Sequence, residues 1–422
     1  MLRCRDVKGK RSTVSAVAWC LFVAICSYPK QTPAENSMLN QLASTLVETE
    51  LFHARRQTRY TLIELKTPHQ VLSTSGSNGG LSDRVRYLVN HQSMEASNHS
   101  AQFEKILALS AAEYHASVAA DLKLDPHLVS LMGTAANMQN TAHAVKTYKD
   151  LRIDAFVTAG VRGNALRAGD RAQWAQGEDG NHFVEQHGTI NIVVLINKPM
   201  LPGALSKAAM VATEAKSSVL QELAIGSRVS PHIATGTGTD QLIIAAAINE
   251  QQQPLESASG HLKTGELVGT AVRAALFDAL KWQSGLERSR TRNILHAMQR
   301  FGLDEESLMS QLAQRMPAED YTLLNDNRNS MLYDARLTAA AFAYAAVLDR
   351  LAYGTLSPAV AQEVLKDQAA NVAVGLSTRT RQWPEFWQQI SVNPEQPLHA
   401  FVQAIALGWQ AKWQPSSSAT QP

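Results

Sequence analysis

The chain has 422 residues, of which 45% are hydrophobic and 18% are charged, and its formal net charge is +2. This composition is ordinary for a globular protein long enough for two domains, and the near-neutral charge without a basic stripe argues against nucleic acid as a partner. All three cysteines, Cys4, Cys20 and Cys26, lie near the N-terminus. The rest of the chain therefore has no disulfide, cysteine nucleophile or thiolate metal site.

The N-terminal residues are expected to form a leader and a linker. Several basic residues precede an apolar run over 14–26, which is too short to span a bilayer but is typical of a signal peptide. Two interpretations stay open: a signal-like segment over 3–28 that exports or lipid-anchors the protein, or translation from Met38. Residues 29–57 are mainly polar and are interpreted as a linker. No stable membrane span is expected.

Residues 58–286 are expected to form an α/β domain of the mixed α+β layered type. Short runs rich in β-branched residues alternate with longer segments of helical periodicity, which is the pattern of layered sheets and helices. Strands are predicted at 60–65, 69–75, 151–160 and 188–197, with a Gly-rich turn at 76–81. Helices are predicted at 102–122, 201–225 and 264–281.

After the basic stretch at 287–292 the strand signals vanish. Ser357 followed by Pro358 is a typical helix start, because serine caps the helix and proline fits its first turn. The pattern predicts an all-α helical domain over 287–415 and a disordered tail at 416–422. Its helices are expected at 292–301, 304–315, 330–352, 358–371 and 396–412.

One loop, from Thr235 to Asp240, alternates threonine with glycine and ends in a carboxylate. Glycine allows close approach to the backbone, and threonine hydroxyls form hydrogen bonds. The loop is either a binding loop at a strand end or a tight hairpin with polar caps. Gln241 stands where a dinucleotide fingerprint needs glycine, and no P-loop sequence occurs in the chain, so a nucleotide phosphate is not implied.

The predicted helix over 205–223 carries a lysine on its apolar stripe. Lys216 falls among leucines and alanines, whereas Glu214 lies on the opposite side. A lysine in such a stripe either extends to an edge or is placed for a purpose. A regular helix cannot aim both side chains into one pocket, so the pattern favours Lys216 as the functional residue.

Three further polar residues lie at strand or helix ends. Asn164 occupies a glycine-flanked turn, and Asn191 interrupts an apolar strand, where it is either functional or a hydrogen-bonded core amide. Glu266 opens a helix, where a carboxylate complements the helix dipole in any case. No zinc-protease motif and no nucleophile-elbow motif occurs, so neither a metal nor a cofactor is expected.

Six sequence blocks occur in order and at close spacing: LSTSGSNGG (72–80), VTAGVRGNALRAGD (157–170), GTINIVVLIN (188–197), ATEAKSSVLQEL (212–223), ATGTGTDQLIIA (234–245) and SGHLKTGELVGTAV (259–272). Taken as a set, they resemble the adenosylcobinamide amidohydrolase family over about 60–285. The resemblance implies hydrolysis of the aminopropanol amide of adenosylcobinamide to adenosylcobyric acid, a corrinoid as the substrate partner, and a cytoplasmic place in cobalamin (vitamin B12) salvage.

Amide hydrolysis needs an attacking water or hydroxyl, donors for the oxyanion and an acid for the leaving amine. We expect Asp240 or Glu214 to be the general base and Lys216 the electrophile, with Glu266 as a further catalytic candidate. Two alternatives stay open: a non-catalytic corrinoid-binding protein, and an unrelated amide or acyl-transfer enzyme with a threonine nucleophile from the 235–240 loop. The substrate-binding candidates are Asn78, Gly79, Gly80, Asn164, Asn191, Thr235, Thr237 and Thr239.

Overall fold

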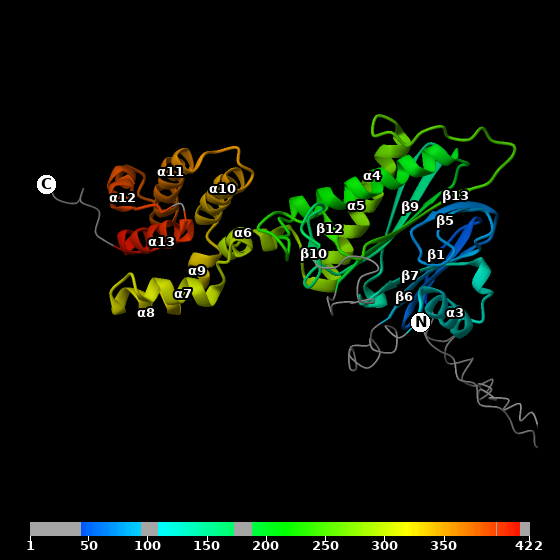
Figure 1. Cartoon of the computed structure of the whole chain (residues 1–422), viewed down its shortest axis with the longest axis horizontal. Helices are drawn as coiled ribbons and strands as arrows, with labels where there is room; N and C mark the ends of the chain where they lie inside the picture. The colour runs from blue at the N-terminus through cyan, green and yellow to red at the C-terminus, as the bar shows by residue number, and fades with distance from the viewer. Residues whose placement is uncertain (1–43, 94–108, 173–187, 394, 414–422) are drawn as a thin grey trace, which may run out of the picture. The chain divides into compact units, whose positions relative to one another are not determined.

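The structure is a computed structural model that describes residues 44–93, 109–172, 188–393 and 395–413 (Figure 1). The signal-like segment at 3–28, the first part of the helix expected over 102–122 and the tail at 416–422 lie outside these residues. Within the described part of the chain, every helix is too short or too polar to cross a membrane.

One sheet, here called sheet A, is formed mostly by the first strands of the chain. Its strand order is β1-β2-β3-β6-β7, with antiparallel pairs except for the parallel pair β6 and β7. The strands are β1 (Ser44–Glu48), β2 (Phe52–Arg56), β3 (Tyr60–Leu65), β6 (Tyr87–Gln92) and β7 (Val129–Thr134).

The second sheet, sheet B, has the order β5-β4-β13-β11-β9-β8, and only β11 and β13 run parallel. A separate two-stranded ribbon pairs β10 (Ala165–Leu166) with β12 (Gly236–Thr237). The strands of sheet B are β4 (His69–Ser73), β5 (Gly80–Ser82), β8 (Ala142–Tyr148), β9 (Leu151–Ala159), β11 (Ile190–Ile196) and β13 (Gln241–Ala247).

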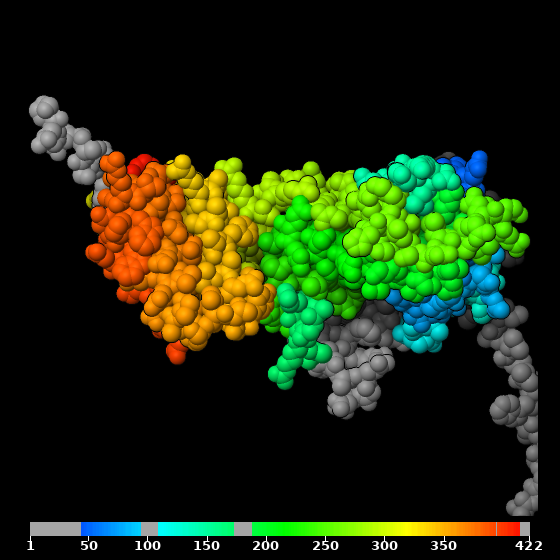
Figure 2. Space-filling model, turned by 90° about the horizontal axis from the view of Figure 1, so that it is seen from above, coloured from blue at the N-terminus to red at the C-terminus, as the bar shows by residue number. Residues whose placement is uncertain are grey.

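Helices and sheets stack in four layers. Helices α4 (Pro202–Glu222) and α5 (Lys263–Ser284) pack on one face of sheet B, sheet A packs on the other, and α3 (Ala111–Asp121) covers the outer face of sheet A. Seen from above, α4 and α5 form the surface over sheet B (Figure 2). Sheet B is covered on both faces because its strands bury side chains on both faces. In β11, Ile192 belongs to the core under the helices, and Val193 belongs to the core between the sheets.

After α5 the described chain is helical. Helix α11 packs against both α10 and α13, and the largest buried side chains of this region's own core are Trp409, Tyr344 and Phe401. The predicted start of α11 is confirmed, since the Ser357 side chain accepts a hydrogen bond from Val360 N at the helix N-terminus. The helices are α6 (Ile294–Met298), α7 (Glu305–Ala313), α8 (Ala318–Asp326), α9 (Arg328–Leu332), α10 (Ala335–Ala352), α11 (Pro358–Ser377), α12 (Trp383–Gln389) and α13 (Pro397–Trp413).

The predicted fold class, a mixed α/β region followed by helices, is confirmed, but the linker interpretation of 29–57 is wrong from Ser44 onward. Residues 44–56 form β1 and β2, which extend sheet A. Phe52 and Ala54 point inward and are buried. Their burial offsets the loss of conformational entropy when the segment becomes ordered. Helices α8 and α12 were not predicted, because each is short and largely exposed.

Candidate active site

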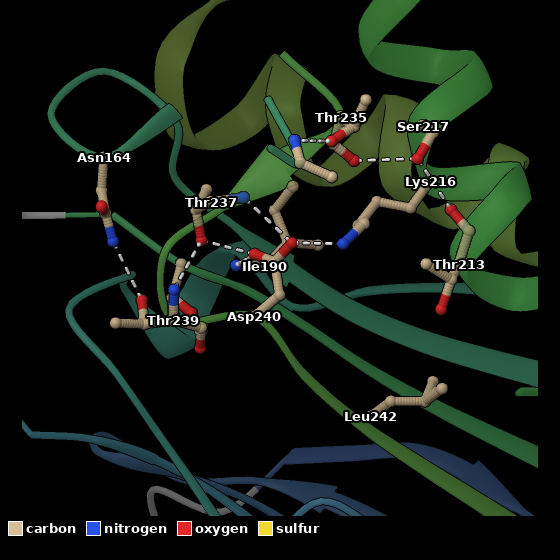
Figure 3. Close-up of polar contacts among 12 residues, drawn as sticks. Asn164, Ile190, Thr213, Lys216, Ser217, Thr235, Thr237, Thr239, Asp240 and Leu242 are labelled. Atoms are coloured by element: carbon tan, nitrogen blue, oxygen red, sulfur yellow. Dashed lines mark hydrogen bonds and ion pairs between the residues drawn. The ribbon is translucent and has the colours of Figure 1, made fainter. Parts of the chain in front are cut away.

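At the end of the Thr235–Asp240 loop, Asp240 forms a largely buried ion pair with Lys216 of α4 (Figure 3). Asp240 Oδ2 accepts a hydrogen bond from Lys216 Nζ and another from Thr237 N at 3.0 Å, and Asp240 Oδ1 accepts from Thr237 Oγ1 at 2.5 Å and Ile190 N at 3.0 Å. The side chains of Lys216 and Asp240 are 11% and 16% exposed. Asp240 therefore joins the loop to α4 and to the first residue of β11.

The helix α4 delivers Lys216 to this position. The prediction that Lys216 lies on the buried face is confirmed, because it is buried together with Ala212 and Val219 on the stripe that packs against the protein. Glu214 is exposed on the other face. Glu266 is half-exposed at the start of α5 and pairs with Lys263 at 2.7 Å. In the described part of the chain, neither glutamate is hydrogen-bonded to Lys216 or Asp240.

Close approach explains both glycines of the loop. A Cβ at position 236 would lie 2.7 Å from Lys216 Nζ and would collide with Asp240 Oδ2. A Cβ at position 238 would lie 3.0 Å from the Asn164 side-chain oxygen. Glycine is used here so that the backbone can pass beside the ion pair, and not for an unusual backbone angle.

The remaining loop residues hold the turn in shape. Asn164 Nδ2 donates to Gly188 O at 2.8 Å and to Thr239 Oγ1 at 3.1 Å. Thr235 Oγ1 accepts from Ala168 N at 2.8 Å. The structure thus brings Asn164, Thr235, Thr237 and Thr239 together around Asp240, as an assembly drawn from several separate segments (Figure 3).

Two contacts of the loop come from residues that sequence reasoning missed. Thr189 Oγ1 donates to Thr239 O at 2.6 Å, and Ser217 Oγ donates to Thr235 O at 2.9 Å. Ser217 follows Lys216 directly in sequence. Thr189 precedes β11, whose first residue, Ile190, donates its N–H to Asp240. The available signals were a hydroxyl next to a lysine for Ser217 and a hydroxyl at the start of a predicted strand for Thr189, and both are too common to have singled out either residue.

Asn191 lies on the opposite face of sheet B. Its Nδ2 donates to Asn90 Oδ1 at 2.8 Å and to Gly133 O at 3.0 Å, and Asn90 Nδ2 donates to Thr158 Oγ1 at 2.8 Å. Asn191 is 1% exposed, between the two sheets. Its Nδ2 is thus bonded as in a core amide and is separate from the Lys216–Asp240 pair, whereas its buried Oδ1 accepts no hydrogen bond within the described residues.

Asn78, Gly79 and Gly80 lie in the turn between β4 and β5. Asn78 Nδ2 donates to Pro126 O at 2.7 Å and to Val129 O at 3.1 Å, which ties the turn to β7. A Cβ on Gly79 would collide with the backbone oxygen of Ser75, and Gly80 has a φ of +81°. The polar and glycine residues of this turn are thus used to shape it.

A second buried carboxylate lies at the other end of sheet B. Asp154, on β9, accepts two parallel hydrogen bonds of 2.7 Å from Arg152 and one of 2.8 Å from His143. Burial by itself raises the pKa of the Asp154 carboxyl, but the hydrogen bonds from His143 and Arg152 outweigh burial and lower the pKa below its ordinary value. Arg152 and Asp154 line a cavity of about 230 Å³.

A larger cavity, of about 1240 Å³, lies elsewhere. Arg162, Gly226 and Arg300 are among its lining residues, whereas Lys216, Asp240 and the threonines of the loop are not. The loop is therefore distinguished by its charges and hydrogen bonds, and not by the size of a neighbouring cavity.

Comparison with known proteins identifies the class. Residues 43–288 match the family model described as adenosylcobinamide amidohydrolase, whose name denotes hydrolases that act on an amide. The match spans more than half of the chain and contains both sheets and the Lys216–Asp240 pair. The chain belongs to the adenosylcobinamide amidohydrolase family.

Two individual proteins are similar to this chain. An uncharacterized protein of Methanocaldococcus jannaschii is 30% identical over 234 residues, which are 53% of this chain and 86% of the relative. A Pyrococcus horikoshii OT3 protein of known crystal structure is similar over 56% of this chain and 82% of its own, with 11% identity and a TM-score of 0.26.

Proposed function

We propose that this protein hydrolyses the aminopropanol amide of adenosylcobinamide, giving adenosylcobyric acid and 1-amino-2-propanol in cobalamin salvage. Membership of the family supports the substrate class and the bond that is cleaved. The proposal is carried by the Lys216–Asp240 pair, which lies inside the matched region. In this pair the ammonium of α4 meets the carboxylate at the end of a threonine-rich loop (Figure 3).

The pair supplies the two charges that amide hydrolysis requires. Asp240 accepts the proton of the attacking water or hydroxyl, and Lys216 stabilises the negative charge that develops on the amide oxygen or assists the departing amine. Of the two carboxylates expected as the base, Asp240 contacts Lys216, whereas Glu214 is exposed on the other face of α4. Asn164 and Thr237 position the loop around these groups.

The direct experiment is to incubate the purified full chain with adenosylcobinamide and to identify the corrinoid product by mass spectrometry. We expect conversion to adenosylcobyric acid with release of one aminopropanol per corrinoid. A Lys207→Met variant is the matched control for Lys216→Met, since Lys207 lies on the same helix outside the ion pair. Tight binding of adenosylcobinamide without product would contradict hydrolysis and favour a corrinoid-capture protein.

We further propose that residues 287–415 are a separate helical domain. The support is the loss of strands after α5 and the independent core around Trp409. Limited proteolysis should cut near 287–292 before it cuts within α4 or α5. Initial cuts spread evenly over both regions would contradict the division.

We propose a cytoplasmic location, because the product of the reaction feeds the later assembly of the cobalamin nucleotide loop. N-terminal sequencing of the native protein checks this. A mature start just after the apolar run, or a lipid on Cys26, would place the protein outside the cytoplasm.

A further inference from the structure

Thr237 and Asp240 are bound to each other through both ends of the carboxylate. Thr237 Oγ1 donates to Asp240 Oδ1 at 2.5 Å, and the backbone N–H of the same residue donates to Asp240 Oδ2 at 3.0 Å (Figure 3). The side-chain direction of Thr237 is therefore fixed toward one oxygen of one carboxylate. A hydroxyl that is within hydrogen-bond reach of a base is the first part of an activated nucleophile.

Asp240 is in turn oriented by a third group. Lys216 Nζ pairs with Oδ2, and Ile190 N donates to Oδ1. The Thr237 hydroxyl is therefore hydrogen-bonded to the Asp240 carboxylate, which is in turn paired with the Lys216 ammonium. This is the arrangement of nucleophile, base and orienting group that recurs in acyl-transfer enzymes on unrelated folds.

The neighbouring threonines lack this arrangement. Thr235 Oγ1 accepts a backbone N–H from Ala168. Thr239 Oγ1 accepts from Asn164 and donates to Gly188 O. Neither of these hydroxyls contacts a carboxylate in the described part of the chain. The structure thus distinguishes one threonine among three that the sequence alone left equivalent.

We propose that Thr237 is the catalytic nucleophile and that the amide is hydrolysed through an ester between Thr237 and the corrinoid carboxyl group. This inference rests on the proposed amidohydrolase function and adds to it a covalent intermediate. It commits the reaction to side-chain attack, where the proposed function by itself allows direct attack by water.

The steps balance with water as the only co-substrate. Thr237 Oγ1 forms a bond to the amide carbon while its proton passes to Asp240, and Lys216 stabilises the charge on the amide oxygen. The C–N bond then breaks, and the proton on Asp240 is transferred to the departing amine nitrogen. Water attacks the ester carbon, gives its proton to Asp240, and the C–Oγ1 bond breaks as Thr237 recovers the proton. The net reaction is amide plus water to carboxylic acid and amine.

The test uses the full chain, adenosylcobinamide and hydroxylamine as a competing acceptor. Thr237→Val keeps the side-chain shape without the hydroxyl, Thr237→Ser keeps the hydroxyl, and Thr213→Val is the control. Thr213 lies on α4 near the site and is exposed, and its hydroxyl donates to Ala209 O of the same helix. Turnover, corrinoid binding by equilibrium dialysis and the product mixture are measured for each protein.

We expect Thr237→Val to lose turnover on the order of 10³-fold or more, with binding of adenosylcobinamide retained. Thr237→Ser and Thr213→Val should stay within about tenfold of the wild type. With hydroxylamine present, the wild type should form a corrinoid hydroxamate, since the ester partitions between the two acceptors.

Two results would overturn the inference while leaving the proposed function in place. One is a Thr237→Val variant that turns over within about tenfold of the wild type. The other is a wild type that hydrolyses adenosylcobinamide but forms no hydroxamate, because a hydroxyl that only positions water yields no ester to capture. A wild type without any hydrolysis would instead overturn the proposed function and this inference with it.

Discussion

Asp154 on β9 and Asp240 just before β13 are both largely buried carboxylates that pair with a cation, yet their surroundings differ. Asp154 is 2% exposed and accepts two parallel hydrogen bonds from Arg152. Asp240 is 16% exposed and is held by the single ammonium of Lys216, two backbone N–H groups and a threonine hydroxyl. Of the two carboxylates, Asp240 alone accepts a hydrogen bond from a hydroxyl within the described residues.

The difference separates a structural ion pair from one that is suited to chemistry. The guanidinium of an arginine stays protonated, and its planar fork fixes the carboxylate in one geometry. A lysine ammonium is a compact charge on a flexible stem, and it can follow a charge that moves during a reaction. We therefore expect substitutions at Asp154 to change stability alone, and substitutions around Asp240 to change turnover.

Among the substitutions that test this comparison, Asp240→Asn should have the largest effect. Because this change removes proton acceptance while keeping the shape of the side chain, turnover should fall on the order of 10² to 10⁴-fold. Binding of adenosylcobinamide should persist. The melting temperature should also fall, because Lys216 loses its counterion. Steady-state turnover, equilibrium dialysis and thermal unfolding measure the three quantities.

Asp154→Asn is the matched control for that substitution. It should leave turnover within about threefold of the wild type, while weakening hydrogen bonds to a charged group that each contribute about 1.5–3 kcal/mol. Equal losses of turnover in the two asparagine variants would remove the distinction between the carboxylates.

Lys216→Met should have the next largest effect. Loss of one preorganised electrophile typically lowers kcat about 10² to 10³-fold. Removing one partner of a buried pair also destabilises a fold by about 3 kcal/mol, since the remaining charge is left uncompensated. The double variant Lys216→Met, Asp240→Asn should recover part of that stability, measured by urea unfolding, and none of the activity. A double variant less stable than both single variants would argue against direct pairing.

Gly236→Ala tests the close approach beside the pair. The added methyl group has to displace Lys216 Nζ and Asp240 Oδ2, and a misplacement of about 1 Å typically costs on the order of 10² in rate. Gly260→Ala is the control, since its Cβ would meet nothing within 4 Å. Wild-type kinetics for Gly236→Ala would show that the loop does not need its observed geometry.

The smallest expected effect is a difference in acid stability. The pKa of Asp154 is lowered in the folded protein, so the ionised carboxylate stabilises the fold above its unfolded pKa, and this contribution is lost as the pH falls below about 4. The gap in unfolding free energy between the wild type and Asp154→Asn should therefore shrink from pH 7 to pH 3. A gap that stays constant over this range would mean that the carboxylate is not held in its ionised form.

Local patterns in the sequence determined much of this protein. The period of 3.6 residues placed Lys216 on the buried face of α4, and short β-branched runs located β9 and β11, because these periodicities report which side of an element leaves water. The set of blocks indicated the family that the comparison found. β1 and β2 were not predicted. Each has five residues, and so short an alternation of buried and exposed side chains indicates a strand only when its pairing partners are known.

Tertiary structure decided which polar groups meet. Lys216 and Asp240 are 24 residues apart in sequence, and no local period links them. The packing of α4 on sheet B brings one to the other, and the register of β11 beside β13 adds Ile190 N. The packing of sheet A on the other face of sheet B places Asn191 against Asn90 and away from this pair. Sequence patterns report the side on which a residue is buried, whereas its partner depends on how distant elements are stacked.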